Sequence, residues 1–394
     1  KFVAAGGRGE LARWTAIIAA TTLGILVFSR GASFDIIVTF PMTASLVSFY
    51  LYDQRRADGI AKKWLPLTLF YFFIGVALIA KGLIGIVFPF GIVALFYLAS
   101  FRMPDRAFIA SLLWGTLVAV AVAAVWYLPM YDRHGYQFID EFIIQHHFQR
   151  FTSNKYQHPQ PFYFFLWVLP LMTFPWLPIF MAAVVRGVRD GYRRLRDHRT
   201  DEGPSPIAVF GFAWLLVPLV FFSISGSKLP GYVLPSLPGA IIITALYFSR
   251  LSEKSMRWKV AGLAAGASTL VICVVLLITV VPNFAAGDSV KGLVQKADSL
   301  GYTGEQVLNF HSTSHNAEFY AAGRLVRDTT GKQRLYWATG DLRNDIAALG
   351  GKPVLVFVRI EHLAQLKSDP TLDVETIADN GETAITRVSL KPMR

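Results

Sequence analysis

The chain has 394 residues, of which 54% are hydrophobic and only 16% are charged. Soluble globular proteins carry nearer to a quarter of charged residues, so this composition excludes an ordinary soluble domain and indicates a membrane-embedded chain. The formal net charge is +12, but the basic residues stand in short loops between apolar runs. There they set the orientation of a multi-span protein and are no evidence of nucleic-acid binding. The single Cys273 excludes an intrachain disulfide framework.

Nine apolar runs dominate the part of the chain before residue 283. A helix needs about 20 residues to cross a hydrocarbon core of about 30 Å, and most of the runs approach that length. Backbone groups find no water partner in lipid, so we expect the runs to be helices of a mainly α, polytopic membrane protein. They lie near residues 12–29, 36–52, 65–80, 83–101, 107–130, 162–184, 207–225, 232–248 and 260–281.

The loops between the runs predict the orientation of the chain. Clusters of Arg and Lys follow the second, fourth, sixth and eighth runs, so a nine-span count puts all of them on one side. The positive-inside rule identifies that side as the cytoplasm. The opposite side receives the Arg30–Asp35, Lys81–Gly82 and Gly226–Tyr232 turns, the segment around Gln145, and everything after about Asn283.

Residues 283–394 differ in character from the rest and predict a second domain. Short apolar runs typical of strands alternate there with segments of helical spacing, which favours a small α/β domain. We therefore divide the chain into a transmembrane domain, residues 1–282, and an extracytoplasmic domain, residues 283–394, interpreted as a lid or acceptor-docking domain. The expected strands are residues 307–310, 354–358 and 384–390, and the expected helices are residues 288–300, 315–322 and 342–349.

Two charged residues stand at the non-cytoplasmic ends of predicted spans. Asp35 begins the second span, where an ionisable residue is a functional candidate; the alternative is a helix N-cap. Lys81, between the third and fourth runs, is a candidate anion ligand; the alternative is a lysine that snorkels to the interface. Gly82 permits a sharp turn whose exposed backbone N–H groups also suit an anion.

A histidine-rich segment lies on the same side, at Gln145–His158. Adjacent helical residues point in different directions, so His146 and His147 are unsuited to bind one metal ion together. One of them is a candidate for a metal or a phosphate, and Arg150 shares a helix face with His146. The alternative for the segment is a solvated polar loop.

The segment Ser225–Pro235 offers a further candidate. Lys228 supplies a point charge and Tyr232 a hydroxyl donor, a useful pair for a phosphate oxygen. Pro230 and Gly231 between them favour a broken turn over a helix. The alternative is that both are ordinary interface anchors. One carboxylate and several cations at the same face of the membrane nevertheless suit one function together, which is to bind a lipid-linked phosphate and act on it.

Three sequence motifs carry a resemblance to a known family: IQHHFQRF followed by HPQPFYFF, AKGLIGIVFPF, and SGSKLPGYVLPSLPG. Together they resemble the polytopic glycosyltransferases of the protein O-mannosyltransferase and lipid A aminoarabinose transferase superfamily. The likeness to the bacterial aminoarabinose transferase branch covers most of residues 10–250, in the right order. It implies a GT-C helical bundle and an inverting, nucleotide-independent transfer from a polyprenyl-phosphate-linked sugar to a lipid or other envelope acceptor. The expected location is the periplasmic face of the bacterial inner membrane.

The resemblance also implies roles for individual residues. Asp35 matches the acidic residue near the catalytic cavity, and the other matches concern the lipid phosphate and a metal ion. Lys81, Arg150 and Tyr232 match positions expected to bind the lipid phosphate, Lys228 belongs to the same turn, and His146 or His147 is implied to lie near a divalent metal ion.

One feature of the family is absent from this sequence. The family's first external loop, with an acidic residue taken as central to catalysis, precedes the part that Lys1 matches. We expect an N-terminal segment with that loop upstream of Lys1. The alternatives to the enzyme proposed here are a protein O-mannosyltransferase-like enzyme, a lipid transporter and a non-catalytic scaffold subunit. A transporter is disfavoured, because its polar residues should recur near mid-membrane.

Overall fold

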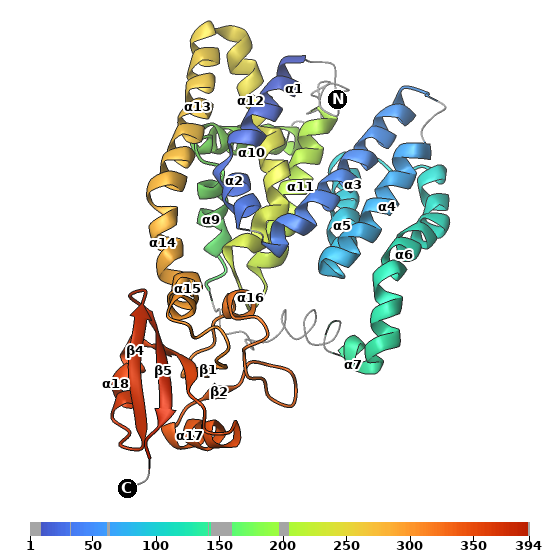
Figure 1. Cartoon of the computed structure of the whole chain (residues 1–394). Helices are drawn as coiled ribbons and strands as arrows, with labels where there is room; N and C mark the ends of the chain where they lie inside the picture. The colour runs from blue at the N-terminus through green and yellow to red at the C-terminus, as the bar shows by residue number, and fades with distance from the viewer. Residues whose placement is uncertain are drawn as a thin grey trace. The chain divides into compact units, whose positions relative to one another are not determined.

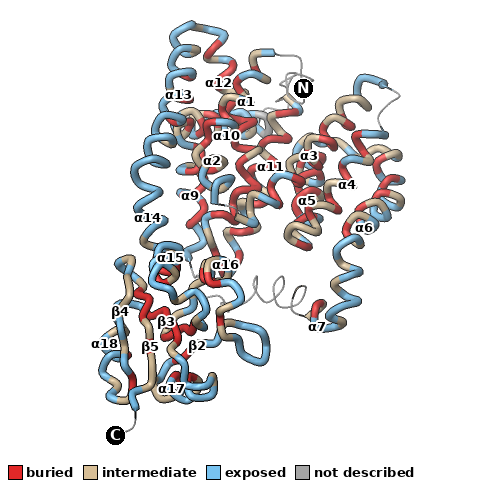
Figure 2. Tube along the Cα trace, in the orientation of Figure 1, coloured by how far each residue is buried: buried red, intermediate tan, exposed pale blue. Residues whose placement is uncertain are grey.

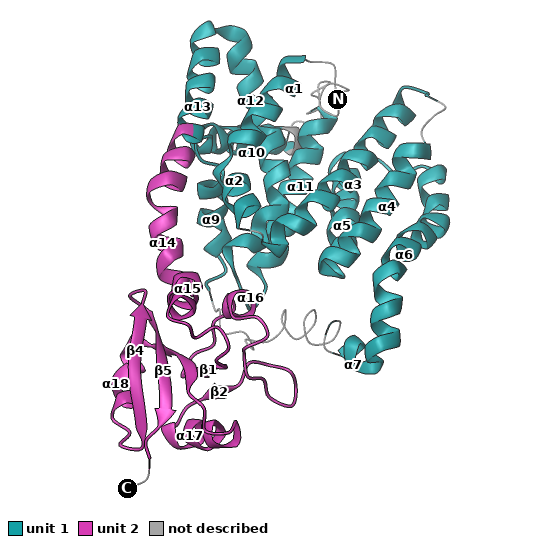
Figure 3. Ribbon diagram, in the orientation of Figure 1, with its two compact units in different colours: residues 1–270 teal, residues 271–394 magenta. Residues whose placement is uncertain are grey.

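The computed structural model describes residues 9–31, 33–60, 64–140, 142, 160–196 and 205–392 of the chain. The chain divides into two compact units, residues 1–270 and residues 271–394 (Figure 3). The described part of the first unit is built from helices, and the second contains a five-stranded sheet. The prediction of a mainly helical membrane protein with a C-terminal α/β domain is therefore confirmed.

The helices of the first unit follow the predicted apolar runs in order (Figure 1). The last of them, α13, continues into the second unit. The elements are α1 (Gly9–Thr21), α2 (Leu23–Arg30), α3 (Phe34–Ala57), α4 (Trp64–Lys81), α5 (Ile84–Ala99), α6 (Arg106–His134), α7 (Tyr136–Phe138), α9 (Phe164–Met172), α10 (Leu177–Arg196), α11 (Pro206–Ser223), the 3₁₀ helix η3 (Pro230–Ser236), α12 (Leu237–Lys254) and α13 (Met256–Thr279).

Six helices among the described residues are long and apolar enough to cross a membrane, or seven if the bent pair α1–α2 forms one span. The nine predicted runs exceed this number for two reasons. The run at 83–101 forms α5, which is apolar but has only 16 residues. The run at 162–184 is divided between α9 and α10, because Pro175 and Pro178 have no N–H to continue a helical ladder.

The break between α1 and α2 lies beside the break between α9 and α10. The axes of α1 and α2 differ by 49°. Across the two breaks, the backbone N–H of Leu23 donates to the carbonyl of Phe174 at 2.9 Å, and Trp176 Nε1 donates to Thr21 Oγ1 at 2.9 Å. Polar groups at one break thus form hydrogen bonds with polar groups at the other. Such partners are needed inside a membrane, because water is absent there.

Aromatic side chains fill the core of the first unit. The ring centroid of Phe49 lies 5.7 Å from that of Phe70, 6.3 Å from that of Phe96 and 6.1 Å from that of Phe210. All four side chains are fully buried, and such ring pairs contribute beyond the area they bury. Helix α13 shows the opposite pattern in Figure 2, because most of its residues are exposed although the helix is strongly apolar. An apolar helix exposed in this way suits contact with lipid.

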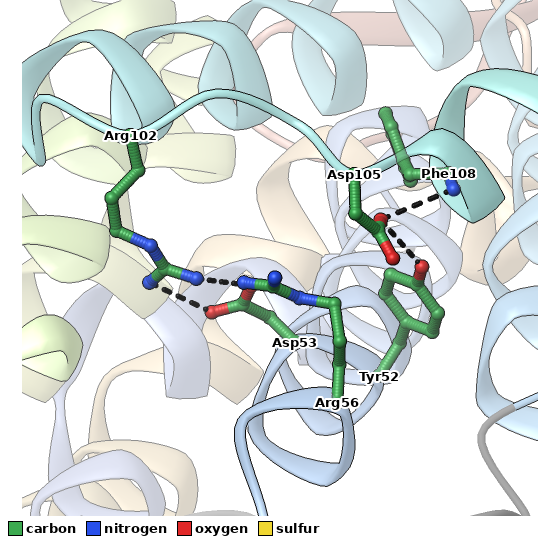
Figure 4. A network of polar contacts seen from close by, with 6 residues as sticks. All are labelled: Tyr52, Asp53, Arg56, Arg102, Asp105 and Phe108. Carbon is green, nitrogen blue, oxygen red and sulfur yellow. Dashed lines mark hydrogen bonds and ion pairs between the residues drawn. The ribbon is translucent and has the colours of Figure 1, made fainter. Parts of the chain in front are cut away.

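A buried polar network joins the C-terminal end of α3 to the α5–α6 loop (Figure 4). Asp53 is fully buried, and its carboxylate accepts hydrogen bonds from Arg102 at 2.9 and 3.2 Å and from Arg56 at 3.0 Å. Asp105 accepts from the Tyr52 hydroxyl at 2.8 Å and caps α6 through the N–H of Phe108. The sequence analysis treated the clusters of Arg and Lys after the second and fourth runs, to which Arg56 and Arg102 belong, only as evidence of orientation.

The second unit is a mixed α/β domain with strand order β2-β1-β3-β5-β4. Strand β1 pairs in parallel with β2 and β3, whereas β5 pairs antiparallel with β3 and β4. Its elements are α14 (Val281–Asp288), α15 (Lys291–Ser299), β1 (Val307–Phe310), α16 (Ala317–Tyr320), β2 (Leu335–Tyr336), α17 (Thr339–Ala348), β3 (Val354–Arg359), α18 (Ile360–Lys367), β4 (Leu372–Asp379) and β5 (Thr383–Leu390).

The three strands and three helices predicted in this region are confirmed, whereas α14, β2, α18 and β4 were missed. Strands β1 and β3 are buried on both faces of the sheet, and that burial makes their sequences continuous apolar runs. Strand β2 has only two residues, and β4 is a polar strand at the edge of the sheet. Helix α18 follows β3 directly, with no turn residue to mark the change.

Candidate functional site

Three segments that are distant in sequence bring charged and aromatic groups together in the first unit. Lys81 Nζ donates to the carboxylate of Asp35 and lies 4.9 Å from the ring centroid of Tyr232. Asp35 belongs to the first turn of α3, Lys81 to the last turn of α4, and Tyr232 to η3. With Gly231, these residues form what we call the Lys81 cluster.

The first turn of α3 fixes the position of Asp35. Ser33 is the N-cap, since its Oγ accepts the backbone N–H of Asp35 at 3.2 Å. The same hydroxyl lies 3.2 Å from Asp35 Oδ2, where it donates to the carboxylate. The alternative that Asp35 is itself the cap is therefore wrong. Its carboxylate is turned to Lys81 instead, and only 13% of its side chain is exposed.

Lys81 is the last residue of α4, and its surroundings differ from those of a lysine that only snorkels to the membrane interface. Its side chain is 24% exposed, and its ammonium is paired with a carboxylate beside an aromatic ring. Gly82 follows with φ of 63°, a left-handed conformation that glycine adopts without strain. The N–H of Gly82 donates to the carbonyl of Leu78 at 2.8 Å. That N–H closes the helix and is not available to an anion, contrary to our expectation.

Close approach of η3 to α3 depends on Gly231. A Cβ at this position would overlap Asp35 Oδ2 and lie 2.8 Å from Cε1 of Phe28. The absence of a side chain at Gly231 therefore lets the backbone of η3 pass directly over the carboxylate and place Tyr232 above Lys81. The sequence analysis noted Gly231 only as a turn residue.

Lys228 and Tyr232, which the sequence suggested as a pair, have different described partners. Lys228 is only 6% exposed, and its ammonium donates to the carbonyls of Ser225 at 2.6 Å and Gln160 at 3.1 Å. Burial lowers the pKa of Lys228. Its described contacts tie the turn before η3 to the segment that leads into α9, whereas Tyr232 faces Lys81.

The remaining candidates, Arg150, His146 and His147, lie outside the described residues. Within the described ranges, no group of three or more His, Cys, Asp or Glu side chains has the geometry to bind a metal ion. The metal ion implied near the two histidines therefore stays a prediction.

An apolar cavity of about 270 Å³ lies next to the Lys81 cluster, between the α4–α5 turn and α6. The hydroxyl of Tyr127, one of its lining residues, donates to the carbonyl of Leu78 at 3.1 Å and so satisfies its own polar group. The cavity is lined by Leu78, Gly82, Leu83, Val120, Ala123, Ala124, Tyr127 and Leu128. Sequence alone did not indicate it, because the lining residues come from two separate spans.

Comparison with known proteins gives a consistent relationship. The family model for dolichyl-phosphate-mannose-protein mannosyltransferase matches residues 3–138. The undecaprenyl phosphate-alpha-4-amino-4-deoxy-L-arabinose arabinosyl transferase of Pectobacterium carotovorum is 32% identical over 247 residues, which are 61% of this chain and 41% of that protein. The enzyme of the same name from Yersinia enterocolitica is 29% identical over 232 residues, 58% of this chain and 39% of that protein. The chain thus matches about half the length of such relatives or less.

Similarity of fold extends further than similarity of sequence. The crystal structure of ArnT from Cupriavidus metallidurans bound to undecaprenyl phosphate has a TM-score of 0.71 with this chain at 17% sequence identity. The match covers 96% of this chain and 79% of that one. Both units of the chain therefore have counterparts in that fold.

Proposed function

We propose that this chain transfers 4-amino-4-deoxy-L-arabinose from undecaprenyl phosphate to lipid A. It belongs in this proposal to the GT-C family of membrane glycosyltransferases, which includes protein mannosyltransferases and bacterial aminoarabinose transferases. The chain is a multi-pass membrane protein. The proposal puts it in the bacterial inner membrane, with its active site and its C-terminal domain on the periplasmic side. The donor is the one named in the relatives' descriptions.

The convergence of Asp35, Lys81 and Tyr232 carries this proposal. Each was selected from the sequence as a separate candidate, and the three come from α3, α4 and η3. The Lys81 ammonium is already positioned by a carboxylate and a phenol ring, so it can bind a more highly charged anion without a large rearrangement. A lipid phosphate is such an anion, and the adjacent apolar cavity has room for part of its hydrocarbon chain.

The chemistry needs a cation at the leaving group. An oxygen of the acceptor attacks the anomeric carbon, the bond from that carbon to the lipid phosphate breaks, and negative charge grows on the phosphate. A cation that is already in place stabilises this charge more strongly in the transition state than in the ground state. We assign this role to Lys81, with Arg150 as the second cation and the Tyr232 hydroxyl as a neutral donor. Lys228 stabilises the turn that carries Tyr232.

Asp35 has two successive roles in this proposal. Before the donor binds, its carboxylate holds Lys81. When the donor phosphate attracts the ammonium, the carboxylate becomes available to take a proton from an acceptor hydroxyl. An acceptor that attacks through a phosphate oxygen is already deprotonated and needs no base, so Asp35 would then act only on Lys81.

A transfer assay with purified protein in liposomes tests the function. We expect product from undecaprenyl-phosphate aminoarabinose and lipid A, and loss of product for Arg150→Ala with folding intact. A fall of roughly 10²–10³ in rate corresponds to the loss of one transition-state contact. The matched control is Arg133→Ala, because Arg133 is an exposed residue in the last turn of α6.

One further pair of substrates and the Arg150→Ala variant separate the alternatives. Product from polyprenyl-phosphate mannose and a Ser/Thr peptide, with none from lipid A, would identify a protein mannosyltransferase instead. Equal rates for the wild type and Arg150→Ala would refute the phosphate role of Arg150. No product from either pair of substrates would support the scaffold alternative.

Gly231→Ala tests whether η3 must contact Asp35 closely. The added methyl group would overlap the carboxylate and displace it from Lys81. We expect the transfer rate to fall about 10²-fold, since a displacement of about 1 Å can cost that much. Gly292→Ala in α15 is the control, because a Cβ there meets no atom within 4 Å. A Gly231→Ala rate equal to that of the control would contradict the proposed geometry.

A further inference from the structure

A second, larger cavity lies at the other end of the first unit. It has a volume of about 700 Å³ and lies between α5, α10, α11 and α12. Arg250, in its lining, is 18 residues beyond Tyr232 along η3 and α12, which corresponds to about 27 Å of helix. The cavity therefore belongs to the membrane surface opposite the Lys81 cluster. The positive-inside pattern predicts that this surface is cytoplasmic.

The lining of this cavity is charged at the rim and apolar inside. Arg186, Arg193 and Arg250 contribute three positive charges and Asp190 one negative charge, a net of +2. Apolar side chains from all four helices line the rest, including Leu95, Ala183, Val209, Phe212, Leu216 and Ile243. We call the whole space the arginine cavity. Its combination of cations and hydrocarbon fits an amphiphile with an anionic head group.

The arginines differ in how they are engaged. Arg186 pairs with Asp190 at 3.6 Å and lies 6.0 Å from the ring of Tyr247. Arg193 and Arg250 form no ion pair with any carboxylate in the described ranges of the chain. Arg250, Arg193 and Asp190 are all exposed, as expected of groups at a rim in contact with water. Two guanidinium groups are thus available to bind a phosphate, which they recognise through paired N–H donors.

Two glycines of α10 shape the space. At Gly187 a Cβ would overlap the ring of Phe212, so this glycine lets the ring pack against α10 and close one side of the cavity. At Gly191, one turn later, a Cβ would meet no atom of the described residues within 4 Å. The helix therefore has open space beside it where it lines the cavity. Ser205 at the start of α11 also lines the cavity, and its buried hydroxyl has no hydrogen-bond partner among the described residues.

We propose that the arginine cavity binds an anionic phospholipid of the surrounding membrane. Arg193 and Arg250 bind its phosphate, Ser205 offers a hydrogen bond to the head group, and the acyl chains lie along the apolar wall. Basic pockets between membrane helices on the cytoplasmic side are a recurrent form of lipid head-group site. The apolar wall distinguishes this site from one for a soluble phosphate compound, which would leave that wall exposed to water. This inference does not depend on the proposed transfer reaction.

The test measures lipid retention by native mass spectrometry after purification from nanodiscs. Phosphatidylglycerol and phosphatidylcholine are offered in equal amounts. We expect the wild type to retain phosphatidylglycerol preferentially, and Arg193→Gln with Arg250→Gln to reduce its affinity at least about tenfold for each arginine. Arg189→Gln is the matched control, because Arg189 is an exposed arginine of the same helix and lies outside the lining. It should retain the lipid as the wild type does.

A second variant changes the space and leaves the charge as it is. Gly191→Leu fills the open volume beside α10 and should lower retention without removing any arginine. In a thermal-unfolding arm, phosphatidylglycerol should raise the unfolding midpoint of the wild type and of Arg189→Gln, because it binds the folded state. Inorganic phosphate and glycerol phosphate should not.

Several outcomes would overturn the proposal. Equal retention of both lipids, or undiminished retention in the double arginine variant, removes the head-group site. Stabilisation by inorganic phosphate as strong as that by phosphatidylglycerol identifies a simple anion site. Full retention by Gly191→Leu places the lipid elsewhere.

Discussion

Replacing Lys81 with methionine is expected to lower the rate of the proposed sugar transfer by roughly 10²–10³, the effect typical of one lost donor to a developing negative charge. The reason is that the Lys81 ammonium lies next to Asp35 and Tyr232, where we propose that it stabilises the charge on the leaving phosphate. The measurement is turnover of undecaprenyl-phosphate aminoarabinose at saturating donor, together with the concentration of donor that gives half the maximal rate. Lys254→Met is the control, because Lys254 is an exposed lysine at the end of α12.

A double-mutant cycle separates catalysis from structure at this position. If Lys81 served only to neutralise Asp35, then Asp35→Asn combined with Lys81→Met would restore the rate, because neither partner would be left alone with a charge. A cation for the leaving phosphate predicts instead that the double variant is at least as slow as Lys81→Met, because it also lacks the carboxylate that we assign as a base. Restoration of the wild-type rate would therefore reject the phosphate role of Lys81 and leave the family relationship intact.

Asp53→Asn is expected to cause the largest loss of stability. The buried carboxylate of Asp53 is shared by two guanidinium groups, of which the Arg102 side chain is 33% and the Arg56 side chain 24% exposed. Removal of the negative charge would leave two partly buried positive charges without compensation, which costs about 3 kcal/mol or more. For a domain of this size, such a loss lowers the unfolding midpoint by roughly 6–12 °C. Thermal unfolding in detergent measures it.

The control for Asp53→Asn lies five residues further along the chain. Asp58 is exposed at the C-terminal cap of α3, so Asp58→Asn should change stability by no more than about 0.5 kcal/mol. Equal unfolding midpoints for the two variants would mean that the network in Figure 4 contributes little to folding. Arg102→Gln should lower the unfolding midpoint less than Asp53→Asn does, because Arg56 still neutralises the carboxylate of Asp53.

Predictions for the fold succeeded where the pattern was strong within one segment. The apolar runs of α3, α4, α6, α11, α12 and α13 are long enough to identify helices by themselves. The run at 162–184 misled the analysis, because hydropathy does not register that two prolines divide it. In the C-terminal domain, β1 and β3 were found because they are buried on both faces, and the edge strand β4 was missed because it is not.

At the site, the residue types were identified from the sequence, but their partners were not. Asp35 and Lys81 were selected because charges at membrane boundaries are unusual, and a separation of 46 residues concealed their ion pair. Asp53 stands in a similar position at the opposite end of α3, yet it was not selected. One segment alone does not show whether a charged residue is solvated or enclosed.

The sequence alone determined that this protein is a polytopic helical membrane protein, which ends of its helices carry charge, and which family it resembles. These properties follow from local composition and from the cost of exposing polar backbone to lipid. Only the tertiary structure decided that Lys81 pairs with Asp35 beneath Tyr232, that Gly231 makes room for the carboxylate, and that Arg193 and Arg250 line a common cavity. Pairings of this kind depend on which helices pack together, and packing is decided by shape complementarity between segments that are distant in sequence.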